Sequence, residues 1–385
     1  MSKEKDKEVI KRIETAIQNI KDKDFNIFFF VIDTKNTPNG SMSYVYQMAK
    51  TLQDKNYNVK MLYQLENEYT TQELEEIEKK GLEYDENRMF ISAASWMGEE
   101  YNTLEHMNIQ KEEWKVSPSD ILFIPEVFSS LMFETFKHNI PCKRYIILQN
   151  YDYISEFIPL GVEWLNYGIK DVITTTSLQE TMVKEIFPYV NTTVVPPYID
   201  NIFRKPVKPK KLIVNIITKH QSTVNKIIKN FYWKYPSYKF VSFRDLRGFP
   251  RKQYAELLQE GAITIWVDDN TYFGYSPLEA IRSGNIVIGK IPENPTEWMT
   301  VDGELRNTGI WFDNYRQLPD ILSRVINAWM NDEVPEELTQ EMEITNTLYT
   351  YSDWDKNVNE LINNVTSQRV NELNSILETV KNNKK

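Results

Sequence analysis

The order of apolar and polar positions along the chain predicts alternating helices and strands. Residues 1–24 carry apolar side chains at helical spacing, which predicts an amphipathic helix. Phe25–Ile32 is a continuous apolar run of strand length, typical of a strand that is buried on both faces of a parallel sheet. A polar loop at Asp33–Ser41, a helical pattern at Tyr44–Leu52 and a strand pattern at Asn58–Tyr63 follow. This β-loop-α-β order indicates a parallel sheet covered by helices.

The same alternation continues along the rest of the chain. Between Leu65 and Lys115 only an acidic helix at Glu68–Lys80 is indicated, and Glu99–Trp114 is undecided. In the first half a helix is predicted to start at Ser177, and the further strands are Asp120–Ile124, Arg144–Leu148, Asp171–Thr175 and Thr193–Val195. In the second half the predicted strands are Leu212–Ile217, Tyr238–Phe243, Ala262–Val267, Ile286–Ile288 and Gly309–Phe312. Its predicted helices are Val224–Tyr235, Arg251–Gln259, Leu278–Ser283, Leu318–Met330 and Trp354–Val380, the last broken at most once near Thr366.

A proline-rich stretch separates the two halves. Pro196–Lys211 holds four prolines and four lysines, which is typical of a stiff, solvated linker. The sequence therefore predicts an α/β fold of two doubly wound domains, residues 1–200 and 212–349, joined by a linker at 201–211. Open sheets of this kind bind ligands at the carboxyl ends of their strands, so we expect a ligand between the domains.

Composition narrows the class of protein. Hydrophobic residues make up 41% and charged residues 26%, which is typical of a globular protein. The net charge of −10 disfavours broad nucleic-acid binding and leaves only a local basic groove open. One cysteine and three histidines exclude a disulfide framework and an ordinary structural zinc site. No apolar run is long enough to span a membrane, and Met1–Lys7 does not lead into a signal sequence, so we expect a cytoplasmic protein.

The segment Trp266–Lys290 carries the most informative chemistry. A strand runs into a polar loop that contains Phe273–Pro277, and a helix is expected to begin near Leu278 with Ser276 as its N-cap. A helix N-terminus presents unpaired N–H groups that bind anions such as a diphosphate. Glu279, expected in the first turn, can accept hydrogen bonds from a ligand hydroxyl, or it can simply be a carboxylate that the helix dipole stabilises.

The run FGYSPLEAIRSGNIVIG resembles the signature of the GT-B glycosyltransferases, in particular the retaining, family-4-like group. The resemblance implies two Rossmann-like domains that face a central cleft, with the first on the acceptor side and the second binding a nucleotide sugar, most often a UDP-sugar. It implies that a C-terminal helix, about 350–385, crosses back to complete the first domain. The residues that it places against the donor are Phe273, Gly274, Tyr275, Ser276 and Glu279, the last on the nucleotide ribose.

Other segments are similar in the expected places. The loop Asn39–Ser41 resembles the glycine-rich loop of this group, so Gly40 and Ser41 join the predicted donor site, although Gly40 also suits a plain turn. Lys219 stands where the group has an arginine, and a cation there would neutralise the leaving diphosphate. Arg244 and Arg247 follow a predicted strand where the group holds the nucleotide base; Lys226 is a weaker second cation.

Two departures from the pattern qualify this reading. Thr271 stands where the group commonly has a sugar-binding glutamate, and lysine in place of arginine at position 219 loses the planar fork of donors. A catalytically inactive binding or scaffold subunit therefore stays open as an alternative, as does an epimerase of sugar nucleotides. The pair Asp268–Asp269 does not favour a metal, because adjacent residues at a strand end point apart. No metal or other cofactor is expected.

The acceptor side is predicted from the ends of strands in the first half. Glu126, Asn150 and Asp152 follow two of these strands and are expected to meet the acceptor, with Glu126 and Asp152 as candidates for proton transfer. Each could instead satisfy local backbone groups. A saccharide or surface glycan is the favoured acceptor; hydroxymethylated DNA, whose base must be flipped out, is the alternative. The sequence leaves the oligomeric state open.

Overall fold

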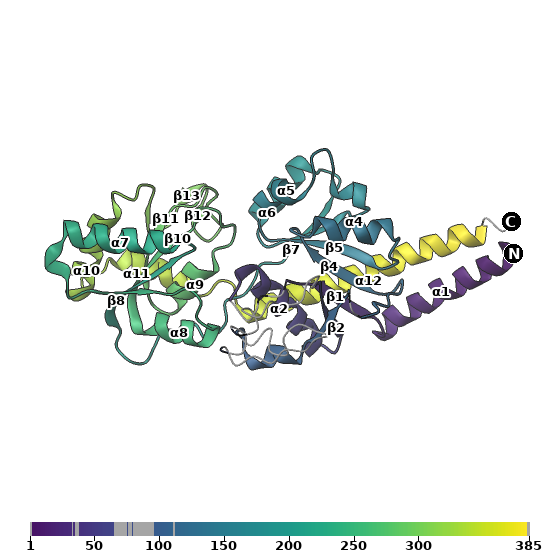
Figure 1. Cartoon of the computed structure of the whole chain (residues 1–385), viewed down its shortest axis with the longest axis horizontal. Helices are drawn as coiled ribbons and strands as arrows, with labels where there is room; N and C mark the ends of the chain where they lie inside the picture. Colours follow the sequence, from purple (N-terminus) through teal and green to yellow (C-terminus); the bar gives the residue numbers. More distant parts are fainter. Residues whose placement is uncertain are drawn as a thin grey trace. The chain divides into compact units, whose positions relative to one another are not determined.

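A computed structural model describes residues 2–32, 34, 38–64, 75, 79, 96–110 and 112–382. The chain divides into two compact units (Figure 1). The first unit consists of Met1–Thr174, Glu180–Val195 and Asp355–Lys385, and the second of Thr175–Gln179 and Pro196–Trp354. The division between the units therefore falls at Val195, compared with the boundary expected near residue 200. Each unit contains a parallel sheet with helices packed on it, which confirms the predicted α/β class.

The first unit is built on a seven-stranded parallel sheet in the order β3-β2-β1-β4-β5-β6-β7. Strand β1, which pairs with β2 and β4, is entirely buried from Ile27 to Phe30, because helices cover both faces of the sheet. The strands are β1 (Asn26–Phe30), β2 (Asn58–Tyr63), β3 (Glu105–Asn108), β4 (Ile121–Pro125), β5 (Lys143–Leu148), β6 (Asp171–Thr174) and β7 (Asn191–Val194). The helices are α1 (Ser2–Asp22), α2 (Gly40–Asp54), α4 (Ser129–Lys137), α5 (Asp152–Phe157), α6 (Ser177–Ile186), the 3₁₀-helices η1 (Glu99–Thr103) and η2 (Trp164–Tyr167), and α12 (Tyr351–Asn382).

The strand order of the first unit reverses between β1 and β4, and this arrangement creates a switch point. Strands on either side of a switch point lead their connections to opposite faces, so a crevice opens at their carboxyl ends. The segments that follow β1 and β4 begin at Val31 and Glu126. The candidate acceptor residues therefore follow strands at, or next to, this switch point.

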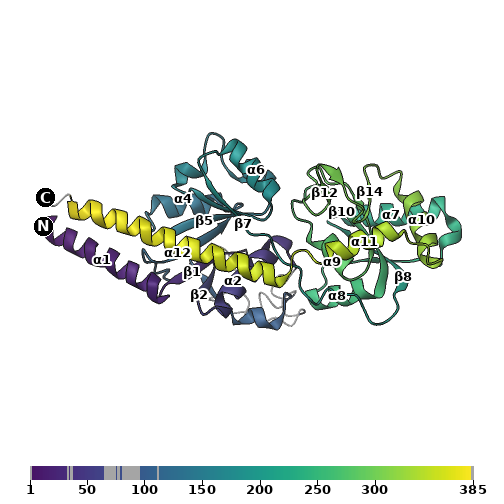
Figure 2. The ribbon, with the colours of Figure 1, turned by 180° about the vertical axis from the view of Figure 1, so that it is seen from behind.

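The long helix α12 belongs with the first unit from Asp355 onward. The Arg369 guanidinium donates hydrogen bonds to the carbonyls of Pro118 and Pro141, at 2.9 and 2.7 Å. Lys381 forms an ion pair of 2.9 Å with Glu14, where α12 and α1 run side by side (Figure 2). The C-terminal helix thus covers the sheet of the first unit, in agreement with the fold that the resemblance implied.

The second unit has a five-stranded parallel sheet in the order β14-β11-β10-β8-β9. All seven residues of β10 are buried, as expected for a strand with neighbours on both edges and helices on both faces. The strands are β8 (Lys211–Thr218), β9 (Ser242–Asp245), β10 (Gly261–Val267), β11 (Ile286–Lys290) and β14 (Ile310–Phe312), with a small antiparallel pair β12 (Thr300–Val301) and β13 (Glu304–Leu305). The helices are α7 (Gln221–Lys234), α8 (Arg251–Glu260), α9 (Tyr275–Arg282), α10 (Leu318–Met330), α11 (Glu336–Thr345) and the 3₁₀-helix η3 (Pro236–Tyr238).

The structure corrects several predicted elements. The strand predicted at Tyr238–Phe243 is instead the end of η3 followed by β9, because Pro236 starts a tight turn and the Tyr238 ring packs on Phe231 at 5.6 Å. Helix α11 was not predicted, and α12 has no break near Thr366. The acidic helix predicted at Glu68–Lys80 lies almost entirely outside the described residues.

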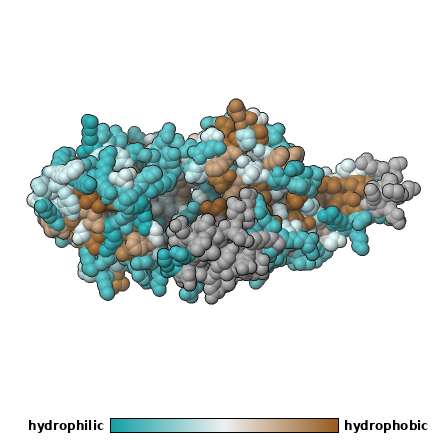
Figure 3. All heavy atoms as spheres, in the orientation of Figure 1, coloured by the Kyte–Doolittle hydropathy of each residue, from teal (hydrophilic) through white to brown (hydrophobic). Residues whose placement is uncertain are grey.

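The surface and the helices add two observations. Figure 3 shows an apolar patch over α5 and the segment after it, where Phe157 and Leu160 are exposed. Within the part of the chain that the structure describes, no helix combines the length and apolar character needed to cross a membrane.

Candidate functional site

The N-terminus of α9 is the centre of the candidate donor site. Helix α9 begins at Tyr275 rather than near Leu278, and its N-cap is Gly274, not Ser276 as predicted. Gly274 has φ 79° and ψ 61°, in the left-handed region, and a Cβ at this position would lie 3.3 Å from the Trp298 ring. Glycine is therefore the residue that this turn accepts without strain. No side chain caps the helix, so its first N–H groups remain available to an anion.

The loop before α9 is held firmly. The Trp298 Nε1–H donates a hydrogen bond of 2.7 Å to the Phe273 carbonyl, and both residues are buried. The Phe273 ring packs edge-on against Tyr275 and Tyr349, at 4.9 and 4.8 Å between ring centroids. These contacts fix the backbone that presents the α9 N–H groups, and preorganised donors of this kind bind an anion without a further cost of ordering.

Glu279 lies in the second turn of α9, one turn later than predicted. Burial raises the pKa of its carboxyl to about 7, while Arg251 lowers the pKa and Asp200 raises it further. The neighbouring Tyr254 hydroxyl is also buried, and its pKa is raised well above 10 by that burial and then by the charge of Glu279. Among the described residues, none donates a hydrogen bond to the Glu279 carboxyl, so both of its oxygens can accept from a ligand hydroxyl.

Two lysines lie at the carboxyl edge of the second unit's sheet. Lys219 follows β8, is 62% exposed, and forms an ion pair of 3.1 Å with Asp268. Lys290, at the end of β11, pairs with Asp269 and lies 5.9 Å from the ring centroid of Tyr315. Sequence reasoning missed Lys290, although its place directly after a buried strand was a usable signal.

Several further residues can now be placed. The adjacent carboxylates of Asp268 and Asp269 pair with different lysines, so they diverge, as the argument from strand geometry expected. Lys226 packs its ammonium 5.1 Å from the Tyr315 ring centroid. Thr271 is half-buried in the loop between β10 and α9. Within the described ranges, no three metal-ligating side chains gather at one point.

Arg244 lies inside β9 and not in the loop after it, which corrects its predicted position. Its guanidinium pairs with Glu260 at 2.6 Å and donates to the Leu257 carbonyl at 3.3 Å, at the C-terminal end of α8. Arg247 occupies the loop instead, where it pairs with Asp245. The contacts of Arg244 do not favour a role against the donor, and that role stays a prediction.

Arg282, on the last turn of α9, was not singled out from the sequence. It donates hydrogen bonds to the carbonyls of Ile199, at 2.5 Å, and Asn346, at 2.9 Å. Ile199 and Asn346 lie near the two ends of the long segment Pro196–Trp354 of the second unit. The helix that carries Glu279 is thereby tied to both ends of that segment.

In the first unit, the start of α2 follows β1. The helix begins at Gly40, earlier than predicted, and the Asn39 side chain caps it by accepting a hydrogen bond of 3.1 Å from the Met42 N–H. A Cβ on Gly40 would meet no atom of the described residues within 4 Å, so none of their contacts requires glycine there. Ser41 is half-buried beside it. The open space leaves room for a ligand but does not by itself indicate one.

Glu126, Asn150 and Asp152 do come together, at the carboxyl ends of β4 and β5. The buried Glu126 carboxylate accepts hydrogen bonds from the N–H groups of Gln149, at 3.1 Å, and Asn150, at 2.8 Å. The Asn150 side chain accepts in turn from the Asp152 N–H at 2.9 Å. Burial raises the pKa of Glu126 to about 7, although these amide bonds pull it down. The geometry is that of a carboxylate which satisfies a neighbouring loop.

Comparisons with solved structures establish the class of fold. The sucrose-phosphate synthase of Thermosynechococcus elongatus superposes with a TM-score of 0.58 at 10% identity, over 89% of this chain and 99% of that one. An alpha-glucosyltransferase in complex with UDP and a 13-mer DNA that contains an HMU base gives a TM-score of 0.53 at 11% identity, over 88% and 98%. The chain has the GT-B fold of two Rossmann-like units, which confirms the fold predicted from the segment around Gly274.

A sequence relative adds a more specific similarity. The chain is 26% identical over 184 residues to an alpha-1,6-glucosyltransferase of Actinobacillus pleuropneumoniae serotype 7 (strain AP76). The match covers 47% of this chain and 56% of that protein, so it spans about half the length of either. No protein-family model matches the chain.

Proposed function

We propose that this protein transfers a sugar from a nucleoside diphosphate donor, a UDP-sugar, to a hydroxyl group of a saccharide acceptor. The observation that carries the proposal is the uncapped N-terminus of α9, fixed by Gly274 and followed by a carboxyl with unused hydrogen-bonding capacity, in a GT-B fold. The similarity to a glucosyltransferase and to a structure that holds UDP supports the same function.

Different residues of the second unit bind different parts of the donor. The N–H groups of Tyr275 and Ser276 face the diphosphate, since Pro277 has none to offer. Glu279 accepts hydrogen bonds from the ribose hydroxyls. Lys219 and Lys290 supply positive charge for the diphosphate. In the structure each of them forms an ion pair with an aspartate.

In the transfer step, the bond between the anomeric carbon and the diphosphate oxygen breaks and a bond to the acceptor oxygen forms. Negative charge grows on the leaving diphosphate, where the α9 N–H groups and Lys219 stabilise it. We propose retention of configuration, with the departing phosphate taking the proton of the acceptor hydroxyl. Glu126 holds the loop of Asn150 and Asp152 in place, and this loop positions the acceptor; no metal or other cofactor takes part.

A saccharide is the preferred acceptor because the similar protein of A. pleuropneumoniae is an alpha-1,6-glucosyltransferase. Hydroxymethylated DNA is the second candidate, since one structural neighbour holds DNA with an HMU base. The net charge of −10 argues against DNA as the main acceptor. We place the reaction in the cytoplasm, where nucleotide sugars are made.

Thermal unfolding with UDP, GDP, ADP, TDP and CDP, and with their common sugar conjugates, tests the donor site. A ligand present at 100 times its dissociation constant stabilises the native state by about 2.7 kcal/mol. We expect UDP and a UDP-sugar to raise the melting temperature of the full chain and of Glu256→Ala, a matched control at an exposed glutamate of α8. Glu279→Ala should lose the shift.

The nucleotide sugar that stabilises the protein is then used as the donor in assays with different acceptors. Turnover is measured with oligosaccharides and with DNA that carries hydroxymethylated bases, with and without a metal chelator. A UDP-sugar that binds without turnover on any acceptor favours the inactive subunit suggested by Thr271. Conversion of the donor without an acceptor favours an epimerase. If no nucleotide stabilises the protein at millimolar concentration, the transferase proposal fails.

A further inference from the structure

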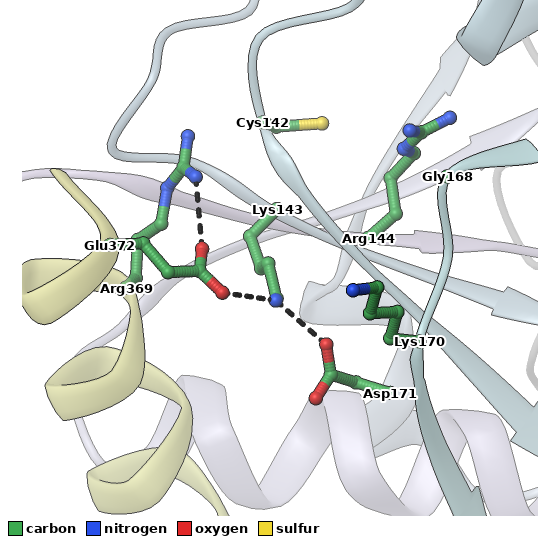
Figure 4. Close-up of a pocket in the computed structure, with 8 residues that line it drawn as sticks. All are labelled: Cys142, Lys143, Arg144, Gly168, Lys170, Asp171, Arg369 and Glu372. Atoms are coloured by element: carbon green, nitrogen blue, oxygen red, sulfur yellow. Dashed lines mark hydrogen bonds and ion pairs between the residues drawn. The ribbon is translucent and has the colours of Figure 1, made fainter. Parts of the chain in front are cut away.

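A pocket of about 350 Å³ opens at the edge of the first unit's sheet that is opposite to the candidate acceptor residues (Figure 4). It lies at the amino-terminal ends of β5 and β6, beside the second half of α12. Substrates of open α/β sheets meet the carboxyl ends of the strands, so this pocket is not part of the proposed transfer site.

One side of the pocket is electrically balanced. Lys143 forms ion pairs with Asp171, at 2.7 Å, and with Glu372 of α12, at 2.5 Å. Arg369 pairs with the other oxygen of Glu372 at 3.2 Å, and Figure 4 shows these contacts as one chain of dashed lines from α12 to β6. Two cations and two carboxylates thus neutralise each other and fasten α12 to the sheet.

The other side carries two cations without carboxylates. Arg144 lies on β5, and the exposed Lys170 directly precedes β6, the neighbouring strand in the sheet. Both side chains line the pocket, and Figure 4 shows them extending into different parts of it. Arg144 donates one hydrogen bond, of 3.1 Å, to the Thr135 hydroxyl. Among the described residues neither cation has an acidic partner, and no dashed line reaches them in Figure 4.

Two cations on neighbouring segments repel each other where no carboxylate offsets their charge. Arg144 is half-buried, and burial lowers the pKa of its guanidinium from the usual value. The buried thiol of Cys142 lies on the same face, but burial raises its pKa to about 12, so it supplies no negative charge at neutral pH. The charge of Asp120 also acts on this thiol, but the carboxylates that line the pocket, Asp171 and Glu372, are already paired with Lys143.

We infer that Arg144 and Lys170 bind a small phosphate ester at a site separate from the proposed donor site. The guanidinium presents a planar fork of donors that matches two phosphate oxygens, and the ammonium adds a second charge. Gly168, with φ 67°, leaves the space beside the guanidinium free, since a Cβ there would lie 3.2 Å from an Arg144 nitrogen. The pocket volume lies at the lower end of the range for small-ligand sites and exceeds the needs of a bare phosphate ion.

Isothermal titration of the full chain with inorganic phosphate and with glucose 6-phosphate tests this site, at an ionic strength held constant with chloride. We expect saturable binding of the ester, and a dissociation constant at least about tenfold weaker in the double variant Arg144→Gln, Lys170→Gln, because charged hydrogen bonds are lost. Lys137→Gln, at an exposed lysine of α4, is the matched control and should bind as the natural protein does.

One further variant and a second measurement on the double variant separate this site from phosphate binding at the proposed donor site. Lys219→Gln removes a donor-site cation and should leave the dissociation constant of glucose 6-phosphate unchanged. The double variant should in turn keep its thermal response to UDP, so a failure of this inference and a failure of the proposed function remain distinguishable.

Thermal unfolding controls for misfolding. Lys170→Gln removes one of two cations that line the pocket, so its melting temperature in chloride alone should be equal to or higher than that of the natural protein, and glucose 6-phosphate should raise it less. Arg144→Lys keeps the charge and should retain part of the affinity. Equal dissociation constants for the natural protein and the folded double variant overturn the inference, as does the absence of saturable binding of both probes at millimolar concentration.

Discussion

The candidate donor edge of the second unit and the candidate acceptor edge of the first unit each hold a carboxyl whose pKa burial raises to about 7. They differ in what those carboxyls contact. Glu126 accepts two backbone hydrogen bonds, whereas none of the described residues donates to Glu279. Burial and a raised pKa therefore do not distinguish a ligand-binding carboxyl from a structural one. The two kinds of carboxyl are distinguished by whether their oxygens still have unused hydrogen-bonding capacity.

Gly274 at the donor edge and Gly40 at the acceptor edge also differ in how much their surroundings constrain them. Gly274 is held at positive φ against Trp298, so the turn before α9 has a conformation that the surrounding residues impose. At Gly40 a Cβ would contact none of the described residues, and Asn39 already caps its helix. The donor edge is a rigid structure with open donors and acceptors, while at the described part of the acceptor edge the Glu126 carboxylate is already engaged by backbone N–H groups.

The largest expected effect is that of Lys219→Ala on catalysis. Removing a group that stabilises the leaving charge typically lowers kcat by about 10²–10³-fold. Because Lys219 is exposed and its ion pair is at the surface, the free energy of unfolding should change little. Steady-state kinetics with the identified donor measure the effect, with Lys229→Ala on α7 as a matched control. A kcat that matches the control would remove Lys219 from the transfer step.

Glu126→Gln should change how stability depends on pH. The pKa of about 7 in the native state lies above the value of about 4.3 expected for an unfolded glutamate. The protonated carboxyl thus stabilises the fold at low pH, and this contribution is lost as pH rises through 7. Ionisation of Glu126 costs up to about 3–4 kcal/mol of unfolding free energy by pH 8, since one pKa unit corresponds to 1.36 kcal/mol.

Chemical denaturation between pH 4 and 8 measures this dependence. Glutamine keeps an oxygen that accepts from Gln149 and Asn150, so the variant should gain stability relative to the natural protein as pH rises. Glu134→Gln, at an exposed residue of α4, should follow the natural curve. Parallel curves for Glu126→Gln and the natural protein would show that Glu126 is ionised throughout. Donor binding should be unaffected by this substitution, which sharpens the contrast with Glu279.

Gly274→Ala should destabilise the protein by about 1–3 kcal/mol, because an alanine at positive φ is strained. The added methyl group would also press on the Trp298 ring and shift the turn before α9. Equilibrium unfolding measures the stability, and titration with UDP measures the expected loss of affinity. A variant with natural stability and natural UDP affinity would contradict the rigid-turn argument.

Gly40→Ala is expected to have the smallest effect, and with the opposite sign. Alanine loses less conformational entropy than glycine when a helix forms, so the variant should be more stable by about 0.4–1 kcal/mol. The same unfolding assay serves for both glycine variants. A substantial loss of donor affinity in Gly40→Ala, with the stability gain intact, would show that a ligand approaches this backbone closely.

Much of the fold was accessible from the sequence because its signals are local. Buried strands such as Asn58–Tyr63 and helices such as Leu318–Met330 begin and end where the apolar pattern predicts. The elements that were wrong or missed depend on distant partners. Aromatic residues that read as a strand after Pro236 pack instead on α7, and α11 has a weak pattern that only packing against α9 reveals.

The sequence by itself determined the two α/β units, the GT-B resemblance and the loop that contains Gly274. These features follow from local backbone preferences, because glycine and proline favour turns and a continuous apolar run favours a buried strand. Only the tertiary structure decided which polar side chains are already engaged. It placed Arg244 on Glu260, the amides of Gln149 and Asn150 on Glu126, and Lys290 at the donor edge. The physical reason is that a hydrogen bond or ion pair needs two groups, and the second group comes from a segment that the first cannot specify.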